Sequence, residues 1–555
     1  MAILVPGALS GYIPGVSSYI ISHVRIVAPT DVLSIQAAIM IESLTDAQGL
    51  CALTGLVLIV YVAGGVFYRL YLSPLAKFPG PKLAAATLWY EFYYDNILRG
   101  QYTFKIIELH KKYGPIVRIS PYELHIDEPD YYEVLYSQHS PRDKSYYYTK
   151  QFDLDLSAFG TEKHDLHRRR RAVLNPYFSK QRIQRLEPVI HAEVNKFCQR
   201  IEDFANSGQP APLTHGYTCL TTDIITEYTT TKKFGYLDAP DWLPHWSSTL
   251  KSTGRIGTMA KQFPWILPFM KSFPQSLVTA MDPGMGLFFK LVESCDEQIA
   301  SIIKNREECK DLISQKMSTQ PTLFTEILDS KLPPEEKSTK RLAQEFHVVI
   351  GAGTETTSNT MTVITYHLLK NPEKLKRLLD EIQKLEPDRT AQLSLPELEQ
   401  LPYLSSVVLE GLRLSYGVCT RLQRISPHQP LQFQDYTIPP GTPVGMTSVL
   451  MHHHESIFPD SWNFVPERWL DLAERKRLEK YMVAFTKGSR QCLGMHLARA
   501  EMFITIPTIF RRFNFELYNT TDDDIYIKHD FFVPAPKNQN SEGVRAFVKR
   551  AGEGK

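Results

Sequence analysis

The stretch FTKGSRQCLG at residues 485–494 constrains this chain more than any other part of its sequence. It places a single cysteine, Cys492, between Gly488 and Gly494, directly before the helix-forming stretch MHLARAEMFITIPTIF. Glycine allows backbone conformations and close approaches that a Cβ would block. Amide groups at the start of a helix stabilise a thiolate, and Arg490 is placed to bind a carboxylate through two hydrogen bonds. The stretch therefore predicts a cysteine thiolate on a tight turn that faces a cofactor.

This pattern, Phe485-x-x-Gly488-x-Arg490-x-Cys492-x-Gly494, resembles the haem-binding signature of cytochrome P450 monooxygenases at every fixed position. A lone cysteine beside a glycine carries no such information, because it is more often a small buried apolar residue. The resemblance implies heme b, with Cys492 as the axial ligand of the iron and the other four residues around the cofactor. In such proteins the thiolate increases the electron density on the iron and favours cleavage of the O–O bond.

A second motif lies in the apolar segment FHVVIGAGTETTSNTMTVITYHLL, residues 346–369. The segment has the length of a helix, yet glycines and the polar pair Glu355 and Thr356 interrupt its centre. It resembles the family's oxygen-binding motif, A/G-G-x-D/E-T, through Ala352, Gly353, Glu355 and Thr356. We expect Gly353 to let the helix pass close to the porphyrin and Thr356 to bond the carbonyl of Ala352. Because reduction of dioxygen consumes protons, Glu355 and Thr356 are the predicted proton relay.

The motif ExxR occurs four times, and its context distinguishes one copy. Glu410 and Arg413 lie on an amphipathic helical pattern, LPYLSSVVLEGLRLS, where positions i and i+3 share a face. In the resembled family such a pair joins the arginine of a later P-E-R segment, here Arg468. We expect this buried triad to hold the wall behind the haem rather than to add net stability. The other copies are Glu386/Arg389, Glu474/Arg477 and Glu542/Arg545.

The basic stretch HDLHRRRRAVLNPYFS, residues 164–179, holds His167 and Arg171 at the spacing of a pair that binds a haem propionate in this family. Arg424 resembles a further propionate partner. Arg168 to Arg170 and Lys487 are candidates for a basic face that meets an acidic electron donor.

The run from His452 to His454 lacks a second ligand cluster, so we expect a structural or surface role there and not a metal site.

Residues 47–68 contain no charge and are long enough to cross a bilayer as a helix. A cleaved signal peptide fits less well, because the run is long and begins far from Met1. A buried globular helix is the other alternative. Acidic residues precede the segment and basic residues follow it, which favours a cytoplasmic C-terminal part: Asp31, Glu42 and Asp46 come before it, and Arg69, Lys77 and Lys82 after it.

The predicted organisation is a lumenal segment of unassigned function (1–46), a transmembrane anchor (47–68), a proline-rich connector (69–82) and a haem-thiolate domain (83–555). The resemblance implies a mainly α fold with a small β part. The seven cysteines lack CxxC spacing, which favours a reducing compartment. The formal charge of +2 gives no indication of nucleic-acid binding. We therefore expect a single-pass protein of the endoplasmic reticulum membrane with its catalytic domain in the cytoplasm.

After the cysteine loop the chain leaves no room for a flavin or nicotinamide domain, so electrons from NADPH are expected through a separate NADPH–cytochrome P450 reductase. Details such as HDLHRRRRAVLNPYFS and FGYLDAPDW are similar to filamentous-fungal enzymes of the trichodiene-oxygenase type. That resemblance favours a terpenoid substrate, with a polyketide or an alkaloid-like molecule as competitor. The residues expected to face a hydrophobic substrate, by their position in the family, are Phe346, Val349, Val418, Thr420, Phe531 and Phe532.

The expected reaction is a hydroxylation or related oxidation that uses dioxygen. Two alternatives remain. One is a haem-thiolate isomerase or dehydratase that acts on peroxide-bearing substrates without a reductase; such enzymes tend to lose the acid–alcohol pair that is present here. The other is a non-catalytic haem-binding or lipid-binding membrane protein.

Overall fold

The computed structural model describes residues 47–552 apart from residues 231, 282 and 311–321. The predicted N-terminal segment, 1–46, lies outside the described residues. The chain divides into two units between Phe67 and Tyr68.

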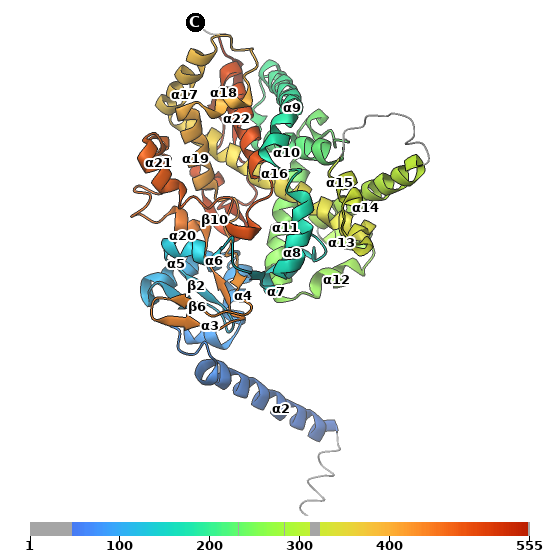
Figure 1. The fold of residues 1–555 in the computed structure, drawn as a ribbon, viewed down its shortest axis with the longest axis vertical. Coiled ribbons are helices and arrows are strands. Elements are labelled where there is room, and N and C mark those ends of the chain that lie inside the picture. The colour runs from blue at the N-terminus through green and yellow to red at the C-terminus, as the bar shows by residue number, and fades with distance from the viewer. Residues whose placement is uncertain (1–46, 231, 282, 311–321, 553–555) are drawn as a thin grey trace, which may run out of the picture. The chain divides into compact units, whose positions relative to one another are not determined.

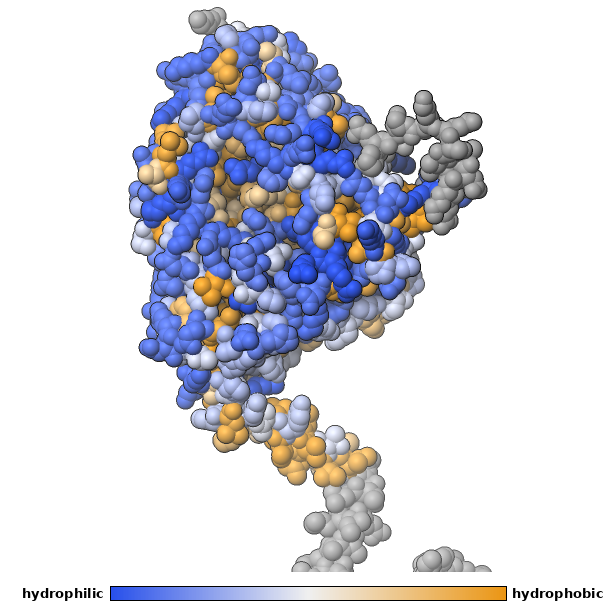
Figure 2. Space-filling view, viewed as in Figure 1, coloured by the Kyte–Doolittle hydropathy of each residue, from blue (hydrophilic) through white to orange (hydrophobic). Residues whose placement is uncertain are grey.

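The N-terminal unit contains helix α2 (Ala47–Phe67), which carries no charged side chain. A π-helical turn, Tyr68–Leu72, continues it. The span Gly49–Leu72 has a mean hydropathy of 2.3, none of it is buried, and it is long enough to cross a membrane. Figure 2 shows the apolar surface of this helix, whereas the visible face of the larger unit is mostly hydrophilic.

The predicted proline-rich connector, residues 69–82, is helical at both of its ends. Residues up to Leu72 are helical, because the first proline that interrupts the helix is Pro74. Helix α3 (Lys82–Ala86) begins directly after Pro81, a position where proline favours the start of a helix. The irregular part is therefore limited to residues 73–81.

The Tyr68–Lys555 unit is mainly helical with small sheets, as predicted (Figure 1). Its longer helices are α5 (Tyr102–Tyr113), α8 (His164–Leu174), α9 (Lys180–Ser207), α10 (Leu213–Thr230), α11 (Pro244–Gln262), α14 (Pro283–Lys310), α16 (Thr339–Lys370), α17 (Pro372–Leu385), α19 (Pro402–Ser415) and α22 (Met495–Arg512). The shorter ones are α4 (Trp89–Phe92), α6 (Tyr132–Leu135), α7 (Tyr146–Thr149), α12 (Ile266–Lys271), α13 (Gln275–Met281), α15 (Leu323–Asp329), α18 (Leu395–Glu399), α20 (Ser448–His452) and α21 (Leu472–Glu479).

Helix α16 is the central element, and it packs against α10, α14, α19 and α22. Its contact with α10 is unusual because hydroxyl groups are buried between the two helices. Buried polar groups must be hydrogen-bonded to avoid a large cost, and here they bond one another across the interface. The pairs are Thr214–Thr362 at 3.1 Å, Tyr217–Thr365 at 2.7 Å and Thr222–Thr354 at 3.1 Å.

Four small sheets complete the unit, and the largest joins segments far apart in the sequence. Its strand order is β1-β2-β8-β5-β3. In it β3 pairs antiparallel with β5, which sets Lys144 opposite Arg424. The strands are β1 (Ile116–Arg118), β2 (Leu124–Ile126), β3 (Asp143–Lys144), β4 (Ala211–Pro212), β5 (Arg424–Ile425), β6 (Leu431–Phe433), β7 (Tyr436–Ile438), β8 (Pro443–Gly445), β9 (Phe513–Leu517), β10 (Ile527–Phe531), β11 (Val533–Pro536) and β12 (Arg545–Arg550).

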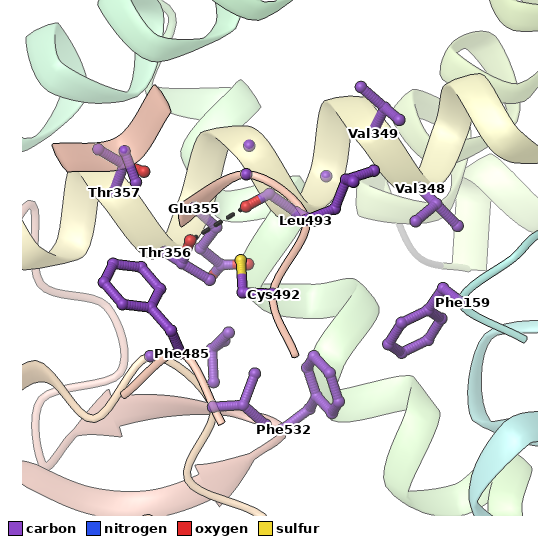
Figure 3. A pocket seen from close by; sticks show the side chains of 18 of the residues that line it. Phe159, Val348, Val349, Glu355, Thr356, Thr357, Phe485, Cys492, Leu493 and Phe532 are labelled. Atoms are coloured by element: carbon purple, nitrogen blue, oxygen red, sulfur yellow. Dashed lines mark hydrogen bonds between the residues drawn. The ribbon is translucent and has the colours of Figure 1, made fainter. Parts of the chain in front are cut away.

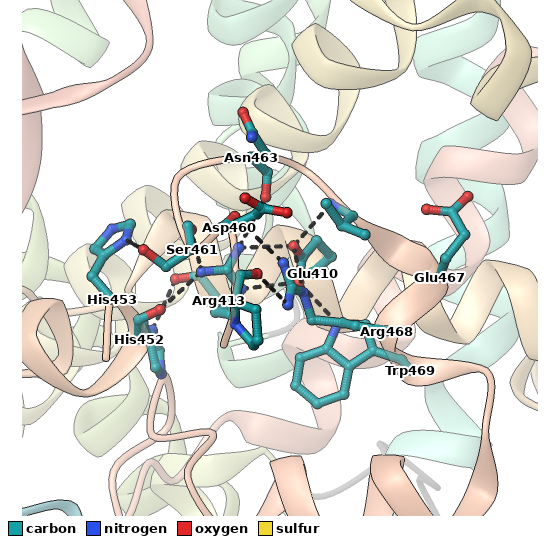
Figure 4. A network of polar contacts seen from close by, with 12 residues as sticks. Glu410, Arg413, His452, His453, Asp460, Ser461, Asn463, Glu467, Arg468 and Trp469 are labelled. Carbon is teal, nitrogen blue, oxygen red and sulfur yellow. Dashed lines mark hydrogen bonds and ion pairs between the residues drawn. The ribbon is translucent and has the colours of Figure 1, made fainter. Parts of the chain in front are cut away.

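A buried ion pair on α19 ties the helix to the irregular segment that follows α20 (Figure 4). Arg413 donates two hydrogen bonds to Glu410, from Nε to Oε2 at 2.9 Å and from Nη2 to Oε1 at 2.8 Å. Arg468 Nε and Trp469 Nε1 also donate to Glu410, at 3.2 and 2.9 Å. Both members of the pair are fully buried. The three residues of the expected triad are thus brought together, and Trp469 adds a donor that the motif does not predict.

The same network extends to the segment before the cysteine loop. Arg413 Nη1 donates to the carbonyl oxygens of His452 and Ser461, at 2.8 and 2.6 Å. His452 bonds the carbonyl of Arg413 through Nδ1 and accepts the amide of Val483 at Nε2, at 2.8 and 3.0 Å. Burial, followed by the charge of Arg413, lowers the pKa of His452 to about 3, so the ring is neutral. Its Nδ1 therefore carries the proton. The imidazole connects α19 to the irregular segment that leads to Phe485.

The prediction from this network concerns Glu410→Ala. The substitution leaves the guanidinium of Arg413 buried without its counter-charge, and we expect the free energy of unfolding to fall by about 3–5 kcal/mol. Urea denaturation of the full-length protein in detergent measures the change.

The matched control is Glu474→Ala, which removes the exposed ExxR pair of Glu474 and Arg477. An exposed ion pair contributes less than about 1 kcal/mol. Equal losses in the two variants would contradict the importance that we assign to the buried pair.

Candidate active site

A cavity of about 340 Å³ lies between α16 and the cysteine loop. Figure 3 shows Cys492 and Leu493 on the loop, opposite the helix that carries Glu355 and Thr356. The predicted ligand and the predicted proton relay therefore face one space, although about 140 residues separate them in the sequence. Most of the exposed lining is apolar.

The cysteine loop holds Cys492 at the start of α22. The amide of Cys492 donates to the carbonyl of Phe485 at 2.9 Å, which closes the turn. Cys492 is an exposed residue, and it lines the cavity. Burial within the protein raises the pKa of the thiol, while a hydrogen bond from the Gly494 backbone and the charge of Arg171 oppose that rise. A bound metal ion deprotonates such a thiol outright.

The two glycines of the loop have different surroundings. Gly488 has a φ of +78°, and a Cβ there would lie 2.2 Å from the carbonyl oxygen of Tyr136. Only glycine fits this position without strain. At Gly494 a Cβ would meet no atom within 4 Å. Gly488 therefore shapes the turn, whereas Gly494 leaves an open face toward the cavity beside the sulfur.

Positive charge collects at one end of the cavity. Lys144, Arg171, Arg424 and Arg490 line it, and among the described residues none of the four forms a salt bridge. Arg490 and His167 each keep a buried nitrogen, Nε and Nδ1, without a hydrogen-bond partner in this part of the chain. Burial and the neighbouring cations lower the pKa of Arg490 to about 9 and that of His167 to about 2. Unpaired buried cations are costly, so this cluster fits the two carboxylates of a haem.

Lys144 is the member of this cluster that sequence reasoning missed. Burial, followed by Arg490, Arg424 and Arg171, lowers its pKa well below the usual value. Pairing of the short strands β3 and β5 brings Lys144 opposite Arg424. The sequence motif on α8 does not include Lys144. Since a two-residue strand has no recognisable sequence pattern, only tertiary structure could find this residue.

Helix α16 presents an open strip to the cavity. Thr356 Oγ1 donates to the carbonyl of Ala352 at 3.0 Å, the contact that the sequence predicted. A Cβ on Gly353 would lie 3.0 Å from the side chain of Ile225 on α10, so the missing side chain also makes room for α10. Gly353 lines the cavity, and its close approach to the porphyrin stays a prediction. The open position is Gly351, where a Cβ would meet nothing within 4 Å.

Glu355 lies between the main cavity and a second, smaller one of about 60 Å³, which has room for a few water molecules. Thr356 also lines both cavities, and Lys251 of α11 lines the smaller one. Burial raises the pKa of Glu355 to about 7, and the positive charge of Lys251 opposes that rise. The carboxyl group is therefore close to half protonated at neutral pH, as a group that gives and regains a proton must be.

Four of the six residues expected to face a substrate line the cavity: Val349, Val418, Phe531 and Phe532. The other two do not. Phe346 is fully buried and packs against the ring of Phe324 at 5.3 Å, so it belongs to the core. Thr420 is also buried and does not line the cavity. Residue spacing alone could not separate these cases, because neighbouring positions on one helix face different elements.

The rings around Phe532 form an aromatic wall that sequence reasoning largely missed. Phe532 has a φ of +77° at the turn between β10 and β11, and its ring lies 5.1 Å from that of Phe152. The rings of Phe159 and Tyr148 each lie 6.0 Å from it. All four line the cavity. The many aromatic residues between positions 146 and 159 are the sequence feature from which this wall could have been predicted.

The basic face proposed for an electron donor is only partly present. Arg170 is buried and donates twice to Glu336, at 2.7 and 2.9 Å, so its assignment to a surface is wrong. Lys487 forms an ion pair with Glu133 at 2.6 Å. Arg168 and Arg169 are exposed.

The histidines of the run 452–454 form local contacts. His452 is structural, and His453 stacks on Trp462 at 3.6 Å and bonds Tyr416 at 2.6 Å.

The fold and this site define a helical protein whose cysteine loop and central helix enclose a cofactor-sized cavity. Residues 79–541 match the family model described as Cytochrome P450. A cytochrome P450 monooxygenase, MO6277, of Ascocoryne sarcoides is 48% identical over 506 residues, which cover 90% of this chain and 98% of that protein. Tryptophan 6-hydroxylase fscE of Fusarium equiseti is 41% identical over 92% of this chain and 100% of its own length. N-acetyltryptophan 6-hydroxylase ivoC of Emericella nidulans is 41% identical over 86% of this chain and 93% of its own length.

This chain belongs to the cytochrome P450 family and is a cytochrome P450 monooxygenase. The family binds heme b through a cysteine thiolate and receives electrons from a reductase. The expected kinship with fungal enzymes of secondary metabolism is also confirmed.

The two glycines of the cysteine loop give a paired prediction. Gly488→Ala forces a Cβ against the Tyr136 carbonyl at a positive φ, so we expect the free energy of unfolding to fall by at least about 2 kcal/mol. Gly494→Ala meets open space, and we expect a change within about 0.5 kcal/mol. Urea denaturation of both variants measures the difference. A larger loss for Gly494→Ala would contradict the separate roles of the two glycines.

Proposed function

We propose that this monooxygenase oxidises an apolar secondary metabolite that contains an aromatic ring. The observation that carries the proposal is the wall of Phe152, Phe159, Phe532 and Tyr148 in the cavity that also holds Cys492. A substrate ring that lies against this wall can form the edge-to-face or offset contacts that pairs of aromatic rings favour. Two relatives, a tryptophan 6-hydroxylase and an N-acetyltryptophan 6-hydroxylase, support an indole as one such ring.

A terpenoid, which the sequence favoured, is the second candidate. Leu250, Val348, Val349 and Val533 also line the cavity. These side chains suit an aliphatic skeleton as well as they suit a ring. The aromatic wall is the reason that we rank the aromatic substrate first.

In the proposed mechanism Cys492 Sγ binds the haem iron, and the bound haem supplies the activation of dioxygen and the oxidation of the substrate. Arg171, Arg424 and Arg490 bind the carboxylates of the cofactor, together with His167 and Lys144. Phe485, Gly351 and Gly494 line the same cavity and would contact the bound cofactor. The apolar side chains around this space exclude bulk water from the reacting carbon.

Protons reach this space through Glu355 and Thr356 in our proposal. The carboxyl group of Glu355 gives a proton to Thr356 Oγ1, and the Thr356 hydroxyl passes its own proton into the main cavity. Water in the smaller cavity restores the proton on Glu355. This pair also argues against an isomerase or dehydratase, which has no use for delivered protons, and against a purely binding protein.

We further propose that α2 crosses the endoplasmic reticulum membrane once. Residues 1–46 are then lumenal, and the part from Arg69 onward is cytoplasmic, where NADPH–cytochrome P450 reductase supplies electrons. The uncharged stretch of residues 47–68 and the basic residues that follow it support this arrangement.

The test of the proposed function is turnover by the full-length protein with this reductase and NADPH. We expect oxidised products from indole-containing substrates in larger yield than from terpene hydrocarbons, with mass spectrometry as the measurement. Cys492→Ala should abolish both product formation and the characteristic spectrum of the reduced carbon-monoxide complex.

Cys198→Ala is the matched control, because Cys198 is buried in α9 and does not line the cavity. This variant should keep the spectrum and the activity. A Cys492→Ala variant that keeps the spectrum would refute the assignment of the ligand. Oxidation of terpenes alone would refute the aromatic preference.

A second prediction uses the charge of Lys251. Lys251→Met removes the charge that lowers the pKa of Glu355, so that pKa rises above about 7. Protonated Glu355 is the donor, so the product formed per NADPH consumed declines as the pH rises through this pKa. We expect the decline to move to higher pH in the variant. The exposed Lys384→Met on α17 makes the same charge change as a control, and identical profiles for both variants would contradict the relay.

A further inference from the structure

His347 of α16 is a polar ring in an apolar part of the main cavity. It lines the cavity beside Val348 and Val349. Its ring lies 5.4 Å from that of Phe288 on α14. Among the residues that the structure describes, none forms a hydrogen bond with it. Burial, followed by the charge of Lys271, lowers the pKa of His347 to about 4, so at neutral pH the imidazole is uncharged and has one donor and one acceptor to offer.

Three other polar side chains that line the cavity, those of Thr249, Thr253 and Glu345, have partners. The Thr249 hydroxyl donates to the carbonyl of His245 at 2.8 Å, and that of Thr253 donates to the carbonyl of Thr249 at 2.9 Å. Glu345 forms an ion pair with Arg341 at 2.8 Å. His347 therefore differs from them in having its hydrogen-bonding capacity available to a ligand.

The position of His347 on the helix relates it to the reacting end of the cavity. His347, Gly351 and Glu355 follow one another at intervals of four residues, so they share one side of α16. Gly351 leaves this strip open, because a Cβ there would meet nothing within 4 Å. Thr356 follows His347 by nine positions on the helix, a rise of about 14 Å. A molecule that lies along this strip can contact His347 at one end while its other end lies near Thr356 and Cys492.

We propose that His347 binds the polar end of the substrate and thereby selects which carbon is oxidised. The substrate class is an elongated, mostly apolar aromatic molecule with a hydroxyl or N–H group at the end remote from the oxidised carbon. A buried polar group gains when a ligand supplies its missing hydrogen bond, and a site built for that bond discriminates against analogues that lack it. The inference rests on the proposed function and adds a recognition element to the aromatic wall.

Biphenyl and 4-phenylphenol test the inference, because they differ by one hydroxyl group. Both are titrated into the haem-loaded full-length protein, with the change in the haem spectrum as the measure of binding. We expect the wild-type protein to bind 4-phenylphenol about tenfold more tightly than biphenyl. With reductase and NADPH, we expect oxidation of 4-phenylphenol at the ring carbon farthest from its hydroxyl group.

Three variants separate recognition from packing. His347→Leu should bind biphenyl as the wild type does but lose the preference for 4-phenylphenol and the selectivity for the far carbon. His347→Gln should restore part of the preference, because its amide can also donate and accept. Val348→Leu changes a neighbouring lining residue and should leave the ratio of the two affinities unchanged.

Equal affinities in the wild type, or a preference that survives in His347→Leu, would overturn the inference. So would the failure of both probes to bind the haem-loaded protein. NADPH-dependent oxidation of biphenyl without any preference would refute the role of His347 alone. No oxidation of either probe would refute the proposed function as well.

Discussion

The ion pair between Glu410 and Arg413 is the interaction on which the rest of the site depends. Its charges are fully buried, so each must be satisfied by neighbouring groups. Arg413 meets this need by binding carbonyl groups of the segment after α20, and His452 then bonds Arg413 and Val483. Val483 lies two residues before the turn that presents Cys492. The pair therefore determines where the cysteine loop can lie relative to α19.

The cavity that this framework encloses is divided by polarity. Lys144, Arg171, Arg424 and Arg490 gather at one end without carboxylate partners among the described residues. Such an arrangement costs stability in the protein alone, and it is understandable where a ligand brings the missing negative charge. Most of the remaining exposed lining is apolar. The neutral imidazole of His347 has no hydrogen-bond partner among the described residues, so it can orient a ligand along α16.

Motifs with local geometry could be predicted from the sequence, and those that depend on tertiary packing could not. The cysteine loop, the bond from Thr356 to Ala352 and the association of Glu410 with Arg413 and Arg468 follow from spacing within one turn or helix, or from the resembled family. The uncharged run that forms α2 and the mainly helical fold were predictable for the same reason. Lys144 was not, because a strand pair of two residues brings it to Arg424.

The errors have a common physical cause. Phe346 was expected to face the substrate, and Arg170 was expected at the surface, yet both turn toward neighbouring elements: Phe346 toward Phe324, and Arg170 toward Glu336. Packing also adds a role that the motif does not show: Gly353 lines the cavity, and its missing side chain accommodates Ile225. Which neighbour a helical side chain contacts depends on the elements that pack beside that helix. A single sequence does not show which elements these are.

The central claim is that Cys492 holds the iron in the cavity below α16. X-ray absorption at the iron edge of the purified, haem-loaded full-length protein tests it most directly. The account predicts a sulfur atom in the coordination sphere of the iron that is absent from Cys492→Ser and present in Cys198→Ala. An iron bound only by nitrogen and oxygen in the wild type, or a sulfur ligand that persists in Cys492→Ser, would contradict it.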